Sequence, residues 1–468
     1  MSLADYGNGI LRTHVTWEEI EKRMQESLGT KAKFGVNKKA TSIGDMKGFC
    51  SIIALIEPEW VEKKDHENLP EKFICKISSL LSFYDMKEMI ALKDEDGWTS
   101  EKFENMAPLL RDTHNREVST YLILMREFNN GRTNLQFPKV YATRKFDDEN
   151  LLQGYILTEF FPNLCDVPNH ECISIKEFEP VVRAIASFSA MGVNLSDSDL
   201  KFSKDFQVVK VLFEQFFNNE VFIISTAMKS NFPPEYLVKI DEFIQMFTTE
   251  FTSPKFVENL ANAAHLLNHR PVLLHGDLCS SNCLFSRDQH DTLEFKALID
   301  FQLASLGSPG QDAARLFATC LGKTERRQNR DHLLRIYYDQ FVNDIGDREI
   351  PYTFEQLVQS YELFFPSMAF TTIPSFFFDN LRTSFTGVPV PTCRWFYNGN
   401  ELLDGLDGYT IITTDAESSL IINFVEKKHF GEYLCTIRNT NGEELANAMI
   451  LSEGSSAALP SRRTTSRR

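Results

Sequence analysis

The first strong hydrophobic pattern in the chain is helical and lies near the N-terminus. Apolar side chains recur there at intervals of three and four residues, at Trp17, Ile20, Met24 and Leu28. That spacing places them on one face of an α-helix. Thr16 and Glu19 have the form of a capping box, and Gly29 follows the last apolar position. The pattern predicts an amphipathic helix between Thr16 and Gly29.

The pattern then changes to short extended runs and back to helical periodicity. Apolar runs of strand length occur at residues 49–56, 72–77 and 154–161. A helical stripe covers residues 108–126 between the second and third of these runs. Beyond Pro162 the helical period dominates, over residues 174–191, over residues 234–247 and again from Asp312. The order of elements predicts a β-rich segment followed by a helical one.

The overall composition predicts a soluble, cytoplasmic protein. With 468 residues, of which 43% are hydrophobic, the chain is long enough for two lobes and a further module. The net charge of −16 argues against nucleic-acid and anionic-membrane surfaces, because both need a basic face. The N-terminus has no secretory pattern, and prolines interrupt the apolar tract at residues 363–378, which is too short to span a membrane. Nine cysteines without disulfide or zinc-site spacing predict free thiols.

The most specific chemical signal consists of three polar side chains that follow two apolar strands. Asp277 and Asn282 stand on a loop after the predicted strand at residues 272–274, and Asp300 follows the predicted strand at residues 295–299. Phosphoryl transfer needs one carboxylate that orients the attacking hydroxyl. It also needs a carboxylate and an amide oxygen that hold Mg²⁺ against the nucleotide phosphates. These three side chains supply those groups.

Each part of this signal alone has a simpler explanation. Asp277 and Asp300 belong to a residue type that often caps turns, and His275 has the character of a hydrogen-bonded core histidine. The combination H-x-D-x-x-x-x-N, followed by an apolar strand, Asp and Phe, is much more specific than either part. Cys279 and Cys283 raise the idea of a metal pair, but no second Cys/His pair follows at zinc-site spacing.

Two charged side chains upstream fall on apolar faces of their predicted elements. Lys76 lies within the strand at residues 73–77, and Glu117 shares a helical stripe with Tyr121 and Leu124. A buried charge is costly alone, and pairing relieves both costs. The alternative is that both side chains reach solvent at the edges of their elements. We expect an ion pair between Lys76 and Glu117.

Gly44 and Gly48 flank a predicted turn between extended runs. Glycine lets backbone N–H groups approach phosphates closely, so the turn is a candidate phosphate-binding loop. The same spacing fits an ordinary hairpin, and both interpretations stay open. The sequence contains no Walker-type phosphate-binding motif.

In chain order, these features resemble the choline-kinase-like (CHK) kinases, relatives of the aminoglycoside phosphotransferases and the ecdysteroid kinases. The residues that carry the resemblance are Gly44 to Gly48, Lys76, Glu117, Glu159, His275 to Asn282, Asp300-Phe301-Gln302 and Asp312. His275-Gly276-Asp277 is the best discriminator, because protein kinases usually carry arginine at the Gly276 position and an A-P-E segment after the metal-binding Asp, and neither appears here. The resemblance covers residues 15–378. It implies a two-lobed, protein-kinase-like α+β fold, with a β-rich lobe at residues 1–158 and a helical lobe at residues 159–378.

The resemblance also implies a function. Such an enzyme transfers the γ-phosphoryl group of ATP to a hydroxyl of a small-molecule acceptor, with Mg²⁺ as cofactor. Asp277 would be the catalytic base, and Asn282 and Asp300 would bind Mg²⁺. Lys76 would contact the nucleotide phosphates, and Glu117 would position Lys76. The remaining contacts with ATP would come from Gly44, Gly48, Glu159, Phe160 and Phe161.

Two features depart from the family pattern. Gln302 stands where many kinases have glycine, at a position that varies in this class. CHK kinases continue into further helices after the segment that corresponds to residues 360–378, whereas this chain changes character near Asp379. We therefore expect a shortened helical lobe.

The C-terminal part, residues 379–451, resembles an immunoglobulin I-set sandwich. The likeness rests on Trp395, Gly431, Tyr433 and Cys435. Most strands expected before Trp395 are missing, and Thr383 stands where the first core cysteine of such a domain falls. We expect a partial all-β sandwich, which is either an appendage or a module that binds a protein partner. The basic tail at residues 452–468 is predicted to be disordered.

Three functional hypotheses follow from the sequence. The leading one is an ATP- and Mg²⁺-dependent small-molecule kinase. The second is a non-catalytic scaffold that combines a pseudokinase with immunoglobulin strands. The third is a chimeric chain that joins parts of two genes, because both parts look trimmed near residue 380. No residue set in the sequence separates a choline-like amine from a sterol or a sugar as acceptor.

Overall fold

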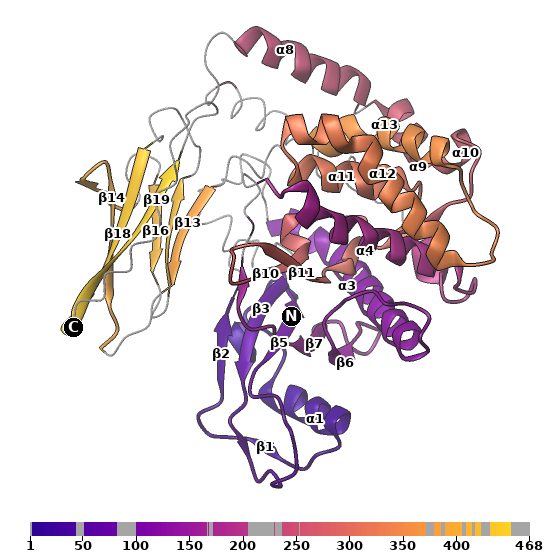
Figure 1. The fold of residues 1–468 in the computed structure, drawn as a ribbon. Helices are drawn as coiled ribbons and strands as arrows, with labels where there is room; N and C mark the ends of the chain where they lie inside the picture. Colours follow the sequence, from indigo (N-terminus) through magenta and orange to yellow (C-terminus); the bar gives the residue numbers. More distant parts are fainter. Residues whose placement is uncertain are drawn as a thin grey trace. The chain divides into compact units, whose positions relative to one another are not determined.

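The computed structural model divides the chain into two compact units (Figure 1). The first comprises Met1–Asn218 and Thr249–Thr372, and the second comprises Asn219–Thr248 and Ile373–Arg468. The structure describes residues 2–43, 51–81, 100–165, 167, 172–204, 229, 236–251, 253–370, 379–384, 389–404, 409–413, 417–422 and 431–450. The predicted turn at Gly44 and Gly48, and the tail at residues 452–468, therefore lie outside the described residues.

The N-terminal part of the first unit is built on a five-stranded antiparallel sheet. In spatial order its strands are β2 (Lys39–Ser42), β3 (Ser51–Glu57), β5 (Phe73–Ser78), β7 (Tyr155–Glu159) and β6 (Val140–Arg144). The strands predicted at residues 49–56, 72–77 and 154–161 are confirmed as β3, β5 and β7. A separate short pair is formed by β1 (Lys33–Phe34) and β4 (Trp60–Val61).

Helix α1 (Trp17–Leu28) packs against this sheet, and its predicted ends are confirmed. The Thr16 side chain accepts a hydrogen bond from the Glu19 backbone N–H, and Gly29 ends the helix with a left-handed φ of 65°. The buried face of the helix shares one core with the sheet, which includes Ile20, Met24, Ile56, Phe73 and Leu157. The sequence pattern alone was sufficient here, because helix face, cap and stop signal agree.

Helix α3 (Ser100–Asn129) follows and carries Glu117. It starts eight residues before the predicted start at Pro108. Proline also favours the first turn of a helix, whereas Pro108 lies in the third turn of α3. In the structure Pro108 lies inside the helix with an exposed side chain. The buried residues of α3 include Leu110, Val118, Tyr121 and Leu124, and Glu117 is buried among them.

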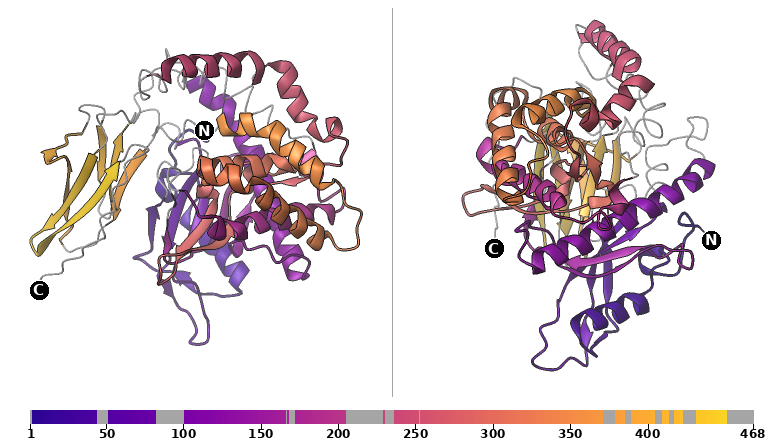
Figure 2. Two further views of the ribbon diagram at one scale, coloured as in Figure 1. Left: turned by 45° about the horizontal axis from the view of Figure 1, so that its top comes forward. Right: turned by 90° about the vertical axis from the view of Figure 1, so that its right-hand side faces the viewer.

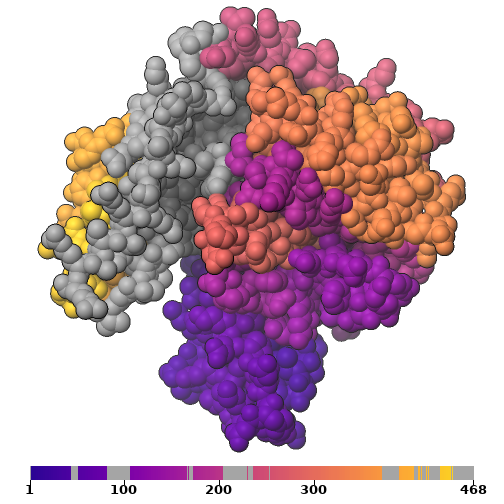
Figure 3. All heavy atoms as spheres, in the orientation of Figure 1, coloured from indigo at the N-terminus to yellow at the C-terminus, as the bar shows by residue number. Residues whose placement is uncertain are grey.

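The rest of the first unit is mostly helical. Its long helices are α4 (Ile175–Val193), α11 (Gly310–Cys320), α12 (Lys323–Ile345) and α13 (Phe354–Phe370). Helix α4 packs on α12, and α11 packs on α13 (Figure 2). On the face shown in Figure 3, α12 and α13 form one continuous surface. The helices predicted at residues 174–191 and from Asp312 are confirmed as α4 and α11.

Short strands and helices connect these elements. Two small antiparallel sheets contain β9 (Val272–Leu274) with β12 (Ser305–Gly307), and β11 (Leu293–Leu298) with β10 (Cys283–Arg287) and β8 (Leu164–Cys165). The short helices are η1 (Ile10–Arg12), α5 (Lys201–Lys204), η5 (Phe247–Phe251), α9 (Pro254–Ala261), α10 (Ala263–Leu266), η6 (Ser280–Asn282) and η7 (Phe301–Leu303). The loop after β9 and the turn after β11 carry the predicted site residues.

The second unit contains helix α8 (Leu237–Met246) and two antiparallel sheets. One sheet has the order β13 (Asp379–Ser384), β17 (Glu417–Ile422), β16 (Tyr409–Thr413). The other has the order β15 (Asn400–Glu401), β14 (Thr392–Tyr397), β18 (Gly431–Asn439), β19 (Gly442–Ile450). Trp395, Tyr409, Leu420, Tyr433 and Cys435 form one buried core. These are the side chains of a β-sandwich with immunoglobulin character.

The N-terminal edge of this sandwich is more complete than predicted. Strand β13 precedes Trp395 and pairs with β17 along its length, and Thr383 lies opposite Ser418. The sequence did not reveal this strand, because its polar residues give a weak strand signal. Cys435 is buried as a free thiol.

No helix among the residues that the structure describes is long and apolar enough to cross a membrane. The apolar tract that begins at residue 363 forms the second half of α13, where Phe364, Met368 and Phe370 are buried. Residues 371–378 of this tract lie outside the described part of the chain.

Candidate active site

Lys76 lies in the middle of β5, between Ile53 of β3 and Ile156 of β7. Its Nζ atom donates hydrogen bonds of 2.9 and 2.8 Å to the two carboxylate oxygens of Glu117. The same Nζ atom lies 2.8 Å from Asp300 Oδ1. The predicted ion pair between Lys76 and Glu117 is therefore confirmed, and Asp300 completes a cluster of one cation and two carboxylates.

Burial controls the protonation of this cluster. Burial raises the pKa of Glu117 to about 7, although the Lys76 ammonium opposes that shift. Burial also favours the neutral form of Lys76. The attraction of Asp300 and Glu117 outweighs it, so the pKa of Lys76 is raised. The two carboxylates together outweigh the single charge of the Lys76 ammonium, so they repel a further anion such as a phosphate. Lys76 can bind such an anion once one of the carboxylates is protonated or binds another cation.

Asp300 reaches Lys76 because its backbone is left-handed, with φ 67° and ψ 60°. This conformation is uncommon for residues other than glycine, and Asp tolerates it better than most. The next residue, Phe301, is buried against the rings of Tyr121, Phe188 and His275. The packed phenylalanine anchors the turn, and the carboxylate projects from it towards β5.

The loop after β9 is held by hydrogen bonds to one buried carboxylate. Asp312 Oδ2 accepts the His275 backbone N–H at 2.7 Å, and Asp312 Oδ1 accepts the Gly276 N–H at 2.9 Å. His275 Nε2 lies 2.9 Å from the Ile299 carbonyl oxygen, which ties this loop to the turn at Asp300. His275 is thus a hydrogen-bonded core histidine, which is the simpler of the two explanations given for it in the sequence analysis.

Asn282 closes the same loop on itself. Its side-chain Nδ2 atom donates a hydrogen bond of 2.7 Å to the backbone carbonyl oxygen of Asp277. The backbone carbonyl oxygen of Asn282 accepts a hydrogen bond of 3.1 Å from the Ile299 N–H. The two predicted metal ligands, Asn282 and Asp300, therefore come from segments that are hydrogen-bonded to each other. With Nδ2 turned to the backbone, the Asn282 side chain has its oxygen left to offer a cation.

Arg315 is a site residue that the sequence interpretation missed. Its Nη2 atom donates a hydrogen bond of 2.7 Å to Asp277 Oδ1, and both side chains are largely buried. Burial opposes the charge of Arg315, but Asp277 outweighs this effect and raises the pKa of the guanidinium. Arg315 stands three residues after Asp312 on α11, but that spacing alone does not indicate a contact with Asp277.

Comparison with known proteins identifies the larger part of the chain. Residues 3–386 match the family DUF1679, which is described as "uncharacterized oxidoreductase dhs-27". The chain belongs to this family. Residues 379–450 match the immunoglobulin I-set domain, so the C-terminal part is an immunoglobulin domain, as predicted.

Proteins similar to the immunoglobulin part include a titin homolog, a muscle M-line assembly protein and solved titin domains. The titin homolog of Caenorhabditis elegans is 80% identical over 73 residues, which is 16% of this chain and 0%, as rounded, of the relative. The muscle M-line assembly protein unc-89 of Caenorhabditis elegans is 41% identical over 71 residues, 15% of this chain and 1% of the relative. A solved tandem of titin immunoglobulin domains is 27% identical, with a TM-score of 0.15 and coverage of 15% of this chain and 37% of that one. The chain thus spans 1% or less of these two curated relatives.

Glu159, Phe160 and Phe161, which the sequence analysis assigns to ATP binding, lie at the end of β7. The Glu159 side chain accepts the Lys139 backbone N–H at 2.6 Å, and the Glu159 N–H donates to the Lys139 carbonyl oxygen, which joins β7 to the start of β6. Phe160 and Phe161 are half-buried at the end of β7. Their assignment to an adenine site stays a prediction.

The donor set in the DUF1679 part fits a hard divalent cation. Asp300 offers a carboxylate and Asn282 an amide oxygen, and oxygen donors of this kind suit Mg²⁺. Mg²⁺ keeps several waters and takes nucleotide phosphate oxygens, so two protein ligands are sufficient. Within the described residues there is no cluster of three or more His, Cys, Asp or Glu side chains that could hold a metal by itself.

Proposed function

We propose that the DUF1679 part of this chain is a CHK-like phosphotransferase, which moves the γ-phosphoryl group of ATP to a hydroxyl of a small molecule. The observation that carries the proposal is the position of Lys76 Nζ, which lies 2.8 to 2.9 Å from carboxylate oxygens of Glu117 and Asp300. Kinase chemistry needs a lysine for the phosphates, a helix glutamate that holds it, and a metal-binding aspartate beside them. A two-lobed kinase-like fold and a cytoplasmic location are parts of the same proposal.

Each residue has a role that its contacts support. Asp277 would orient the acceptor hydroxyl and take its proton, and Arg315 fixes the Asp277 carboxylate. Asn282 and Asp300 would hold Mg²⁺, which offsets the charge of the phosphates when it is bound. Lys76 would then turn from Asp300 to the nucleotide phosphates while Glu117 keeps its ammonium in place.

The family description names an oxidoreductase, and the chain favours phosphotransfer over that activity. A dinucleotide site of the Rossmann type uses a parallel βαβ unit and the sequence G-x-G-x-x-G. The sequence contains no G-x-G-x-x-G. All strand pairs in the part of the chain that the structure describes are antiparallel.

The decisive experiment is a thermal-shift titration with Mg·ATP on the full chain and on Asp300→Asn. A ligand at a hundredfold excess over its Kd stabilises a fold by about 2.7 kcal/mol. We expect a Tm increase that needs Mg²⁺ and is weaker in Asp300→Asn. The absence of any shift in the folded full chain would overturn the proposal. A shift with NADPH and none with Mg·ATP would favour the family description.

A second test separates an enzyme from a scaffold. If the chain is a scaffold, purified protein turns over no ATP with any acceptor. If it is a kinase, ADP release in the presence of an acceptor mixture disappears in Asp277→Ala while the Mg·ATP shift remains, since Asp277 acts on the hydroxyl and not on the nucleotide.

A second proposal concerns the immunoglobulin part. We infer that this part derives from another gene and has been joined to the DUF1679 part, and that it binds a protein partner. The two parts match different families, and these matches overlap only at residues 379–386. The 80% identity with the titin homolog over 73 residues also supports the proposal. A peptide or transcript that spans residues 378–387 would show that the joined chain is made. Its consistent absence beside abundant flanking peptides would make the junction an artefact.

A further inference from the structure

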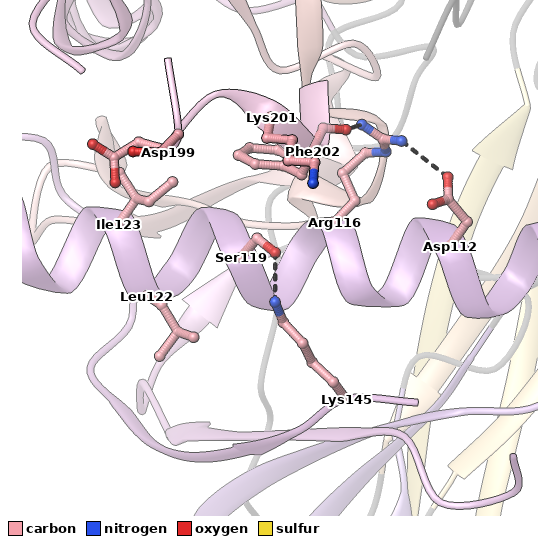
Figure 4. Close-up of a pocket in the computed structure, with 10 residues that line it drawn as sticks. Asp112, Arg116, Ser119, Leu122, Ile123, Lys145, Asp199, Lys201 and Phe202 are labelled. Carbon is pink, nitrogen blue, oxygen red and sulfur yellow. Dashed lines mark hydrogen bonds and ion pairs between the residues drawn. The ribbon is translucent and has the colours of Figure 1, made fainter. Parts of the chain in front are cut away.

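An open groove of about 660 Å³ lies on the exposed side of helix α3 (Figure 4). The helix forms its floor with Arg116, Ser119 and Leu122, and residues 198–202 form one wall. In Figure 4, Lys201 and Phe202 lie on one side of the helix, and Lys145 approaches Ser119 from the other side. The volume is that of a small-molecule site.

The charge of the groove is opposite to that of the protein. The chain has a net charge of −16, whereas the groove is lined by Arg116, Lys145 and Lys201 with only two carboxylates. Both carboxylates are already engaged: Asp112 lies 2.9 Å from Arg116 Nη2, and Asp199 lies 2.6 Å from the neighbouring Arg126. The local excess of positive charge therefore belongs to the lysines.

Neither lysine of the groove has a carboxylate partner among the residues described. Lys145 Nζ donates a hydrogen bond of 2.8 Å to the Ser119 hydroxyl, which carries no charge. The Lys145 side chain is exposed, and partial desolvation lowers its pKa. Lys201 is exposed at the rim. An anion in the groove would satisfy both ammonium groups.

Apolar surface lies beside these charges. The Leu122 side chain is 48% exposed. The Phe202 ring is half-buried, and the Arg116 guanidinium lies 5.9 Å from its centroid. The Phe202 carbonyl oxygen also accepts a hydrogen bond from Arg116, so this wall is fixed to the helix. An aryl or short hydrocarbon group would cover Leu122 and Phe202.

We propose that this groove binds a small amphipathic anion, with a phosphate or carboxylate group held by Lys145 and Lys201 and an apolar group against Leu122 and Phe202. The groove does not use the cluster of Lys76, Glu117 and Asp300. The proposal is therefore independent of the phosphotransferase function.

Isothermal titration of the full chain with phenyl phosphate tests this site. Inorganic phosphate and phenol serve as half-ligands, and we expect phenyl phosphate to bind more tightly than either. Lys145→Gln/Lys201→Gln should weaken the binding of phenyl phosphate by at least about tenfold, which is about 1.4 kcal/mol. Lys31→Gln/Lys63→Gln removes the same charge from two exposed lysines outside the groove and should leave Kd unchanged.

Further arms separate the two parts of the site. Leu122→Ser should weaken phenyl phosphate and leave inorganic phosphate unchanged, and Kd should rise with salt, because exposed charges are screened. No saturable binding of phenyl phosphate to the folded chain would overturn the proposal. Binding that persists in Lys145→Gln/Lys201→Gln, or that is lost equally in the control pair, would overturn it as well.

Discussion

Arg315 Nη2 lies 2.7 Å from Asp277 Oδ1, so helix α11 holds the carboxylate that we propose as the catalytic base. The exposed fractions of the two side chains are 18% and 24%, and the pair is screened little by solvent. The same helix also holds the backbone of the loop through Asp312. One helix therefore fixes both the main chain and the side chain of the candidate base.

The first prediction is a coupling energy between Arg315 and Asp277. In a double-mutant cycle with Arg315→Gln and Asp277→Asn, urea unfolding should give an interaction of about 1.5 to 3 kcal/mol, the range for hydrogen bonds to charged groups. The Tm increase with Mg·ATP should stay within error in Arg315→Gln, because Arg315 does not contact the Lys76 cluster in any described interaction. A coupling near zero would show that the two side chains are not paired in solution.

The second prediction concerns Asp312, whose buried carboxylate accepts two backbone N–H groups. Asp312→Ala leaves both donors without a partner, and each costs about 1 to 3 kcal/mol. Asp312→Asn keeps one acceptor and should cost clearly less. Equal losses of unfolding free energy for the two variants would contradict a role as double acceptor.

The third prediction compares two glycines with positive φ. At Gly276, with φ 87°, an added Cβ would lie 2.3 Å from the Leu303 carbonyl oxygen, whereas at Gly131, with φ 65°, it would meet nothing within 4 Å. Gly131→Ala should cost only about 1 kcal/mol of backbone strain. Gly276→Ala should cost more than twice that, because the turn before Asp277 must also shift. Similar Tm values for the two variants would show that the approach to Leu303 is not tight.

The ion pair between Lys76 and Glu117 was predictable because the sequence places both charges on apolar faces of their elements. A buried charge needs a partner of opposite charge, and few such partners are available in an apolar core. The contact of Lys76 with Asp300 was not predictable, since 224 residues separate them and the left-handed turn at Asp300 leaves no periodic signal. Arg315 was missed for a similar reason. A charged residue on an amphipathic helix is normally solvated, and only tertiary packing turns it towards Asp277.

The immunoglobulin part shows the same limit on a smaller scale. Trp395, Tyr433 and Cys435 were recognisable because large core side chains at fixed spacing are specific. Strand β13 was not, because its pairing with β17 depends on backbone hydrogen bonds that any residue type can make. Side-chain chemistry was therefore easier to predict than strand pairing.

The fourth prediction is a pH dependence from Glu117, whose pKa burial raises from 4.5 to about 7. The folded state holds this proton more tightly than the unfolded chain. Its stabilising effect is therefore complete below about pH 4.5 and is lost as the pH rises to about 7. The quantity to measure is the unfolding free energy of the natural chain minus that of Glu117→Gln. Between about pH 4.5 and 7 this difference should fall with a slope that approaches about 1.4 kcal/mol per pH unit, and above about pH 7 it should stay constant. Glu26→Gln, at an exposed pair with Arg23, is the control. A difference independent of pH would exclude a raised pKa.

The fifth prediction tests the core of the immunoglobulin domain. Trp395 Nε1 donates a hydrogen bond of 2.9 Å to the buried Ser418 hydroxyl, and this bond joins the sheet of β14 to the sheet of β17. Ser418→Ala leaves the indole N–H buried without that acceptor and should cost about 1 to 3 kcal/mol. Thr392→Val removes a hydroxyl whose bond to the Arg438 carbonyl oxygen is exposed, and it should cost less than half as much. Calorimetry of the full chain should show the loss in the unfolding transition of the immunoglobulin domain. If both variants lower that transition equally, the bond between the sheets does not stabilise the domain.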